Sequence, residues 1–268
     1  MANTASARIA DLKPGDGYVQ SFARGLEVIR SFSAKAASQT LTEVAGRAGL
    51  SRAGARRILL TLEALGYVRS DGKLFSLSPR ILDLGFSYLS SMPIWNLAEP
   101  VMEALVAQVH ESSSAAVLDG TDIVYVLRVP TRKIMSISLG VGSRLPAYCT
   151  SMGRILLSAL AQDDLMALLR ASDLAARTKT TLTDAKEIAA KVAQARRQGW
   201  SLVNQELEEG LISLAAPIVD RSGQMVAALN ISGQANRTSA RVMQDTMLEP
   251  LLEAARTISR QLDGTTVD

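Results

Sequence analysis

The sequence predicts an α+β chain with a winged helix-turn-helix near the N-terminus, a linker helix, and then a larger domain of mixed strands and helices. Three observations support this prediction. Two capped, amphipathic helices follow each other between residues 40 and 66, and an Asp-Gly hairpin comes directly after them. From residue 113 onward, runs with the period of strands alternate with runs that have the period of helices.

The first helix of the pair begins at a capping box. The Thr40 hydroxyl is placed to accept from the Glu43 amide while the Glu43 carboxylate bonds back. Gly49 ends this helix, because glycine adopts the left-handed conformation without strain. Ser51 is expected to cap the second helix, whose apolar face packs inward. Its N-terminal and outward residues, which we predict to contact DNA, are Ser51, Arg52, Ala53, Arg56 and Arg57.

A short hairpin follows the second helix. Asp71-Gly72 separates two β-prone runs, which predicts a tight turn with positive φ at both turn positions. Two helices, an arginine-faced outer helix and a basic hairpin together indicate a winged helix-turn-helix, whose outer helix lies in the DNA major groove. Arg69 and Lys73 on the hairpin are expected to contact the DNA backbone or the minor groove.

Charge and composition agree with this division. Residues 1–80 contain 12 Lys and Arg against 6 Asp and Glu, a net charge of +6, whereas the remainder contains 17 against 20, a net charge of −3. The basic excess therefore lies where phosphate contact needs it. The single cysteine excludes an internal disulfide, and no apolar run approaches the ~20 residues of a membrane span. We expect a cytoplasmic protein without a membrane partner.

Four segments are predicted along the chain. They are a flexible lead at 1–17, a DNA-binding domain at 18–78, a linker helix at 79–92 and a ligand-binding domain at 93–268. Apolar residues surround almost the whole circumference of the linker helix, which predicts packing on two sides and a second copy of the chain as the other partner.

The larger domain is expected to contain five or six strands flanked by helices. Helices are predicted at 94–110, 150–161, 163–170, 184–198 and 236–262. Strands are predicted at 114–118, 122–129, 133–139, 200–204, 211–219 and 225–232, and a loop is predicted from 140 through 146.

The residues that usually perform catalysis are scarce. His110 is the only histidine and is expected to be a surface imidazole. Cys149 has no neighbouring His or second Cys, so neither a metal cluster nor a redox pair is predicted around it, and a Cys149–His110 nucleophile pair has no local signature. Glu206, Glu208 and Glu209 are expected to be solvated loop residues. No catalytic residue, metal or cofactor is predicted.

A binding pocket is easier to derive. A loop leads into a helix near Thr150, where free amides and the helix dipole favour an anion such as a carboxylate. Thr150 and Ser151 would add hydroxyls, while Tyr148 and Met152 would supply apolar walls. The alternative is that Ser151 only caps the helix and Met152 belongs to the core. Asn230 and Ser232 share one face of the last strand, so they face either water or a cavity.

This order of motifs resembles the IclR family of bacterial transcription regulators over about residues 18–262. The resemblance rests on Leu65-Gly66-Tyr67-Val68, on Arg144-Leu145-Pro146 before Gly153-Arg154, and on Ile231-Ser232-Gly233. The stretches 50–62 and 205–211 are more specific. They resemble the branch that controls protocatechuate, 4-hydroxybenzoate and β-ketoadipate catabolism.

The resemblance implies a GAF-like effector domain, dimers through the DNA-binding half and often tetramers. Its partners would be double-stranded operator DNA, a small carboxylate effector of the aromatic-acid or β-ketoadipate type and, for an activator, RNA polymerase. The family's effector pocket maps onto Ile134, Ile137, Leu145, Ser151, Met152, Leu211, Ser213, Asn230 and Ser232. Arg154, Arg128 and Arg132 are the alternatives for the cation that meets the carboxylate.

Two other functions stay open from the sequence alone. One is an enzyme whose GAF-like half is tethered to a DNA-binding module, which the shortage of His, Cys and clustered acids disfavours. The other is an effector-independent DNA-binding protein, which the polar-lined last strand disfavours. We therefore expect a ligand-responsive regulator of aromatic-acid catabolic genes in the β-ketoadipate pathway, with activation or repression, operator and acid left open.

Overall fold

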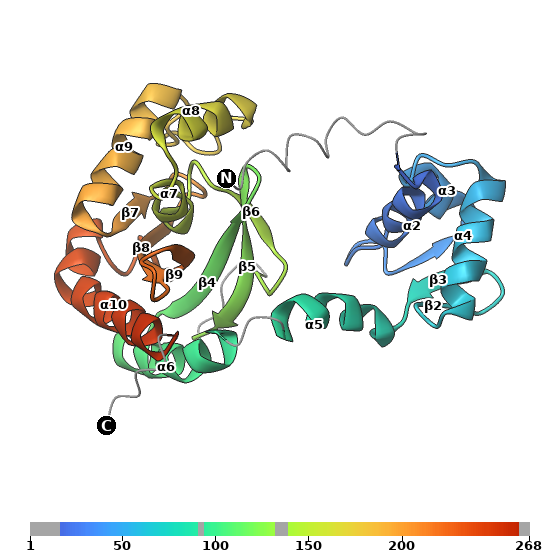
Figure 1. Cartoon of the computed structure of the whole chain (residues 1–268), viewed down its shortest axis with the longest axis horizontal. Helices are drawn as coiled ribbons and strands as arrows, with labels where there is room; N and C mark the ends of the chain where they lie inside the picture. Colours follow the sequence, from blue (N-terminus) through green and yellow to red (C-terminus); the bar gives the residue numbers. More distant parts are fainter. Residues whose placement is uncertain (1–16, 91–93, 132–138, 263–268) are drawn as a thin grey trace. The chain divides into compact units, whose positions relative to one another are not determined.

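The computed structural model describes residues 17–90, 94–131 and 139–262. The chain divides into two compact units, Met1–Ser91 and Met92–Asp268 (Figure 1).

Three helices form the N-terminal unit around one small core. They are α2 (Gln20–Arg30), α3 (Leu41–Arg47) and α4 (Arg52–Ala64). The predicted caps are confirmed. The Thr40 hydroxyl accepts from the Glu43 amide at 3.3 Å, the Glu43 carboxylate accepts from the Thr40 amide at 2.7 Å, and Ser51 Oγ accepts from the Gly54 amide at 3.1 Å. The Thr40 amide and, at 2.8 Å, the Thr40 hydroxyl both donate to the Glu43 carboxylate, and they lower its pKa because they stabilise its charged form.

The wing is a three-stranded antiparallel sheet in the order β1-β3-β2. Its strands are β1 (Ser38–Thr40), β2 (Val68–Ser70) and β3 (Leu74–Leu77). The predicted turn geometry is wrong, because φ is positive at Gly72, at 95°, but not at Asp71. Asp71 Oδ1 instead accepts from the amides of Lys73 and Leu74, at 2.9 and 2.7 Å, so its side chain closes the turn.

The linker begins with a 3₁₀ turn at Pro79–Ile81 and continues as α5 (Leu82–Ser90). No residue of α5 is buried, and its large apolar side chains are widely exposed, with Leu82 at 70% and Phe86 at 67%. A single copy of this unit therefore leaves the large apolar side chains of α5 uncovered.

A six-stranded antiparallel sheet forms the centre of the C-terminal unit, in the order β6-β5-β4-β9-β8-β7. The strands are β4 (Ser112–Asp119), β5 (Asp122–Val129), β6 (Arg144–Pro146), β7 (Ser201–Asn204), β8 (Leu211–Val219) and β9 (Met225–Gln234). Strand β6 falls in the predicted loop, where it pairs with the start of β5. The strand predicted at 133–139 lies almost wholly outside the described residues.

Helices lie on both faces of this sheet. They are α6 (Ile94–Val109), α7 (Ser151–Leu157), α8 (Gln162–Ala171), α9 (Ala185–Gln198) and α10 (Ala240–Leu262). Helix α7 packs on one face and α9 packs against α7, whereas α6 and α10 lie side by side on the other (Figure 1). Residues of β9 alternate between these faces: a Cβ at Gly233 would meet Met243 of α10, while Asn230 and Ser232 face α7. No helix in the described part of the chain combines the length and apolarity that crossing a membrane requires.

Candidate functional site

A cavity lies between the start of α7 and the sheet. Its volume is about 20 Å³, little more than the ~15 Å³ that one water molecule occupies by the same measure. Seven of the predicted effector residues line it, namely Thr150, Ser151, Met152, Leu211, Ser213, Asn230 and Ser232. The sequence therefore predicted much of the lining, although these residues come from three separate segments, at 150–152, 211–213 and 230–232.

Hydrogen bonds hold the polar wall of the cavity in place. Asn230 Oδ1 accepts from the Ser114 amide at 2.9 Å, and Asn230 Nδ2 donates to Ser232 Oγ at 2.9 Å. Ser113 Oγ donates to the Asn230 carbonyl at 2.7 Å. The Asn230 amide group is thus fixed in orientation, which suits a site that selects a ligand by its polar groups.

The start of α7 brings a second wall close to the sheet. Thr150 is the cap, because its hydroxyl accepts from the Gly153 amide at 3.1 Å and donates to the Pro146 carbonyl at 3.0 Å. The alternative in which Ser151 caps this helix is wrong, and Ser151 lies buried on the cavity instead. Gly153 lets the loop before α7 pack directly on the helix, because a Cβ there would lie 2.0 Å from the Ala147 carbonyl oxygen.

Four predicted effector residues are not part of this lining. Tyr148 is buried, but its hydroxyl donates to the Ala175 carbonyl, and Leu145 lies half-buried on β6. Ile134 and Ile137 lie outside the described residues.

Four lining residues were missed by the sequence reasoning: Tyr125, Cys149, Val203 and Leu207. Burial raises the pKa of the Tyr125 phenol to about 12 and that of the Cys149 thiol to about 11. Both groups are therefore neutral at pH 7. Two features of the sequence could have indicated these residues. Cys149 directly precedes Thr150, and Tyr125 carries a polar hydroxyl within a mainly apolar strand.

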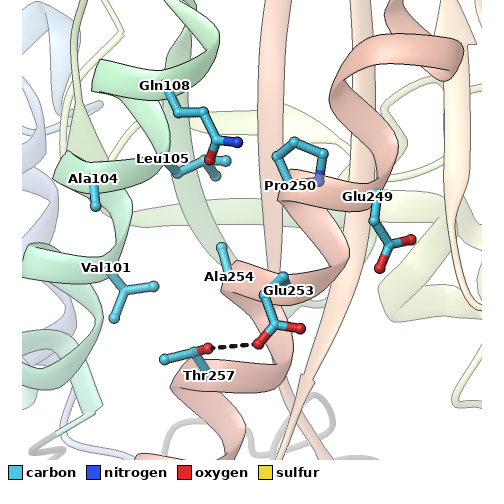
Figure 2. Close-up of a pocket in the computed structure, with 9 residues that line it drawn as sticks. All are labelled: Val101, Ala104, Leu105, Gln108, Glu249, Pro250, Glu253, Ala254 and Thr257. Atoms are coloured by element: carbon cyan, nitrogen blue, oxygen red, sulfur yellow. Dashed lines mark hydrogen bonds between the residues drawn. The ribbon is translucent and has the colours of Figure 1, made fainter.

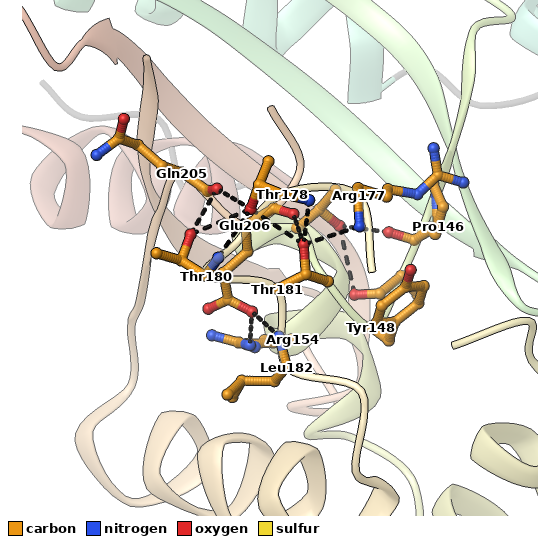
Figure 3. Close-up of polar contacts among 12 residues, drawn as sticks. Pro146, Tyr148, Arg154, Arg177, Thr178, Thr180, Thr181, Leu182, Gln205 and Glu206 are labelled. Carbon is orange, nitrogen blue, oxygen red and sulfur yellow. Dashed lines mark hydrogen bonds and ion pairs between the residues drawn. The ribbon is translucent and has the colours of Figure 1, made fainter. Parts of the chain in front are cut away.

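The expectation that Glu206 is solvated is wrong. Arg154 Nη2 and Glu206 Oε2 lie 2.6 Å apart, and their side chains are only 2% and 10% exposed (Figure 3). The same Glu206 oxygen accepts from the Leu182 amide at 3.3 Å. A buried charge of this kind is tolerated only when it is paired, so α7 and the 205–210 loop are tied together by this ion pair.

Three threonine hydroxyls hold the backbone of the same loop (Figure 3). Thr178 and Thr180 donate to the Gln205 carbonyl at 2.6 and 2.8 Å, and Thr181 donates to the Glu206 carbonyl at 2.6 Å. Because Leu207 and Leu211 line the cavity, these bonds fix one of its walls.

A second hollow lies on the other face of the sheet, between α6 and α10 (Figure 2). Its volume is about 420 Å³, and Glu249 and Glu253 line its α10 side. Glu253 accepts from Thr257 and pairs with Arg256 and Arg260, and the hydrogen bond from Arg256, with the charges of both arginines, lowers its pKa. Glu249 also pairs with Arg256, at 2.6 Å, so both carboxylates of this hollow are already matched by arginines of α10.

The predicted DNA-contacting residues are all exposed in the N-terminal unit. Arg52, Arg56 and Arg57 extend from α4, as do Ala53 and its cap Ser51. Arg69 lies on β2 and Lys73 in the turn of the wing. The N-terminal unit therefore exposes basic side chains on α4 and on the wing, and that these residues contact DNA stays a prediction.

A basic winged helix joined to a domain with a polar-lined internal cavity defines a ligand-responsive DNA-binding regulator. Comparison with known families specifies the class. Residues 21–72 match the IclR helix-turn-helix domain, and residues 86–260 match the C-terminal domain of bacterial transcriptional regulators of the IclR type. The chain belongs to the IclR family.

Curated relatives and solved structures cover nearly the whole chain. It is 45% identical to the Pca regulon regulatory protein of Pseudomonas putida, over 92% of this chain and 85% of that protein. It is 34% identical to the p-hydroxybenzoate hydroxylase transcriptional activator of Acinetobacter baylyi, over 88% of this chain and 89% of that protein.

Two solved structures have the same fold. A transcriptional regulator from Rhodococcus sp. RHA1 superposes with a TM-score of 0.83 at 48% identity, covering 91% of this chain and 98% of that one. An IclR homologue from Microbacterium hydrocarbonoxydans, solved with 4-hydroxybenzoate, superposes with a TM-score of 0.80 at 25% identity, covering 90% of this chain and 98% of that one.

Proposed function

We propose that this chain regulates transcription of genes for aromatic-acid catabolism in the β-ketoadipate pathway, in response to a small carboxylate effector. The observation that supports this most strongly is the neutral, polar-lined cavity in a chain 45% identical to a Pca regulon regulator. The complex of a 25% identical homologue with 4-hydroxybenzoate supports the same class of ligand. Protocatechuate, 4-hydroxybenzoate and β-ketoadipate are the acids to test.

The size of the cavity suggests how the signal is transmitted. An aromatic acid does not fit into about 20 Å³, so binding requires its walls to move. A ligand shifts the balance between two conformations only by its difference in affinity for them. The α7 start and the 205–210 loop supply the walls, and their movement would separate a ligand-bound from a ligand-free arrangement. A coupling of ~1–3 kcal/mol between effector and operator is the usual range.

We further propose that the cavity binds its ligand without converting it. Its thiol, Cys149, has a pKa raised to about 11 by burial. The thiolate is the reactive form, so this group is inert at pH 7. The enzyme alternative therefore lacks a reactive thiol in this cavity, and none of the described lining residues is a His, Asp, Glu or Lys that could activate its serine and threonine hydroxyls. An effector-independent protein would not need a polar wall held in a fixed orientation.

Replacing Ser151 with Leu is expected to abolish effector binding, because the larger side chain fills the cavity. Overpacking costs roughly 1–3 kcal/mol of stability, so thermal melting and operator binding must accompany calorimetry with the three acids. The matched control is Thr257→Leu, which adds a leucine to the hollow between α6 and α10. If Thr257→Leu abolishes binding while Ser151→Leu retains it, the effector site is the other hollow.

We also propose that the chain forms a homodimer through its N-terminal unit. The exposed apolar residues of α5 lie in the same unit as an apolar groove of about 950 Å³, lined in part by Phe22, Leu26 and Leu65. Exposed apolar side chains gathered in this way mark an interaction surface.

Sedimentation of the wild-type chain should give a dimer at micromolar concentration, and the double variant Phe86→Glu with Leu82→Glu should sediment as a monomer. A wild-type chain that sediments as a monomer and binds DNA as one contradicts this proposal. Pairing of dimers into tetramers is the further assembly that the same experiment would reveal.

A further inference from the structure

The cavity itself offers no positive charge to a carboxylate. All of its lining side chains are neutral at pH 7. A buried carboxylate without compensating partners is costly, and an arginine fork is the geometry that suits it best. The cation must therefore come from beside the cavity.

Arg154 is not free to fill this role. Its guanidinium is buried and already pairs with Glu206 at 2.6 Å. An effector that took Arg154 would leave the Glu206 carboxylate buried beside it, which combines an unpaired charge with repulsion between two anions. This pair is a structural tie between α7 and the 205–210 loop.

Arg128 lies in the same row of the sheet as a residue that lines the cavity. Strand pairing places Arg128 on β5 opposite Ser114 on β4, and Ser114 opposite Asn230 on β9. Residues directly opposite each other in a sheet point to the same face, so Arg128 extends from the face on which Asn230 lines the cavity. Tyr125, three residues earlier on β5, lines the cavity as well, because a bulge between the two places it opposite Ala116 of β4, on the same face as Ser114.

Hydrogen bonds connect the same row. Arg128 Nη1 donates to Ser114 Oγ at 3.2 Å, and the Ser114 amide donates to Asn230 Oδ1 at 2.9 Å. Arg128 is only half-buried, and within the described residues no carboxylate lies within ion-pairing distance of it. Its charge also acts on the Tyr125 phenol, whose pKa it lowers against the larger effect of burial. An oriented guanidinium without an anion thus lies at the edge of the neutral cavity.

We propose that Arg128 is the specificity-determining residue that pairs with the carboxylate of the effector, positioned by Ser114 and by the Asn230 wall. This inference rests on the proposed function and names the group that selects acids over neutral aromatic compounds. When the walls move to admit the ligand, the cavity extends along the row from Asn230 toward Arg128, so the carboxylate lies at the β5 edge.

The test compares 4-hydroxybenzoate with 4-hydroxybenzamide, which keeps the ring and hydroxyl but lacks the charge. Calorimetry on the full wild-type chain should give an affinity for the acid at least roughly tenfold above that for the amide. Arg128→Gln should reduce this ratio to about one by weakening the acid alone. Arg128→Lys should retain part of the ratio, because it keeps the charge and loses the fork.

Arg177→Gln is the matched control, since Arg177 is exposed and its charge acts on Cys149 from another side of the cavity. It should leave the ratio unchanged. If Arg128→Gln keeps the wild-type ratio of acid to amide affinity, or if Arg177→Gln removes it, the inference is wrong.

A second pair of variants covers the case in which Arg128→Gln unfolds below the assay temperature. Arg128→Lys and Ser114→Ala should both lower the ratio of acid to amide affinity, because both keep the positive charge but change how it is positioned. A wild-type chain that binds none of the three acids overturns the proposed function, which is a different result from an unchanged ratio.

Discussion

Replacing Arg52, Arg56 and Arg57 together with Gln is expected to abolish specific operator binding. Each arginine that reads a guanine edge contributes ~1–3 kcal/mol, so the triple variant should lose roughly a hundredfold or more in affinity. All three side chains are exposed on α4 and none caps the helix. Glutamine has a similar helix propensity, so the N-terminal unit should keep its fold.

The measurement is titration of an operator selected from random duplexes by the wild-type chain. The matched control is the triple change of Arg170, Arg197 and Arg221 to Gln, which removes the same charge from exposed sites of the C-terminal unit. The control should retain operator affinity. Equal losses in the two variants would mean that net charge, rather than the α4 surface, accounts for binding.

Replacing Arg154 with Met is expected to destabilise the C-terminal unit by about 3–5 kcal/mol, because it leaves the Glu206 carboxylate buried without its cation. The threonine hydroxyls bind the loop's carbonyl groups and cannot neutralise that charge. Thermal and denaturant unfolding of the full chain would measure the loss.

The control for this change is the double variant Arg154→Met with Glu206→Leu. Exchanging a buried ion pair for apolar residues of similar size is often neutral or stabilising, so the double variant should recover much of the loss. If the single and double variants are equally unstable, the pair is not the source of the effect and packing around α7 is responsible.

The sequence predicted those features that short stretches of chain determine by themselves. Thr40 with Glu43 and Ser51 with Gly54 are contacts within one helical turn, so the residue types suffice to predict them. The polar alternation of Asn230 and Ser232 likewise places both on one face of β9.

Features that depend on distant partners were beyond reach of this reasoning. Glu206 reads as a solvated loop residue until α7 brings Arg154, 52 residues away in the chain, into contact with it. Strand β6 is too short to show an alternating pattern and forms because β5 offers it an edge. At Asp71 the local rule itself failed, since a side-chain oxygen took the place of the expected backbone conformation.

The pairing of β4 with β9 has a consequence for synthesis on the ribosome. These strands, the first and last of their sheet, meet at its centre, and the bond from Ser113 to Asn230 spans 117 residues of chain. Contacts this distant form late, because the closure entropy must be overcome before they contribute. The N-terminal unit, complete by Ser91, has emerged long before β9 is translated, and domains fold as units during synthesis. The nascent chain therefore acquires its DNA-binding surface before it acquires the effector cavity, and a product truncated ahead of β9 would retain operator recognition with no means of responding to the acid.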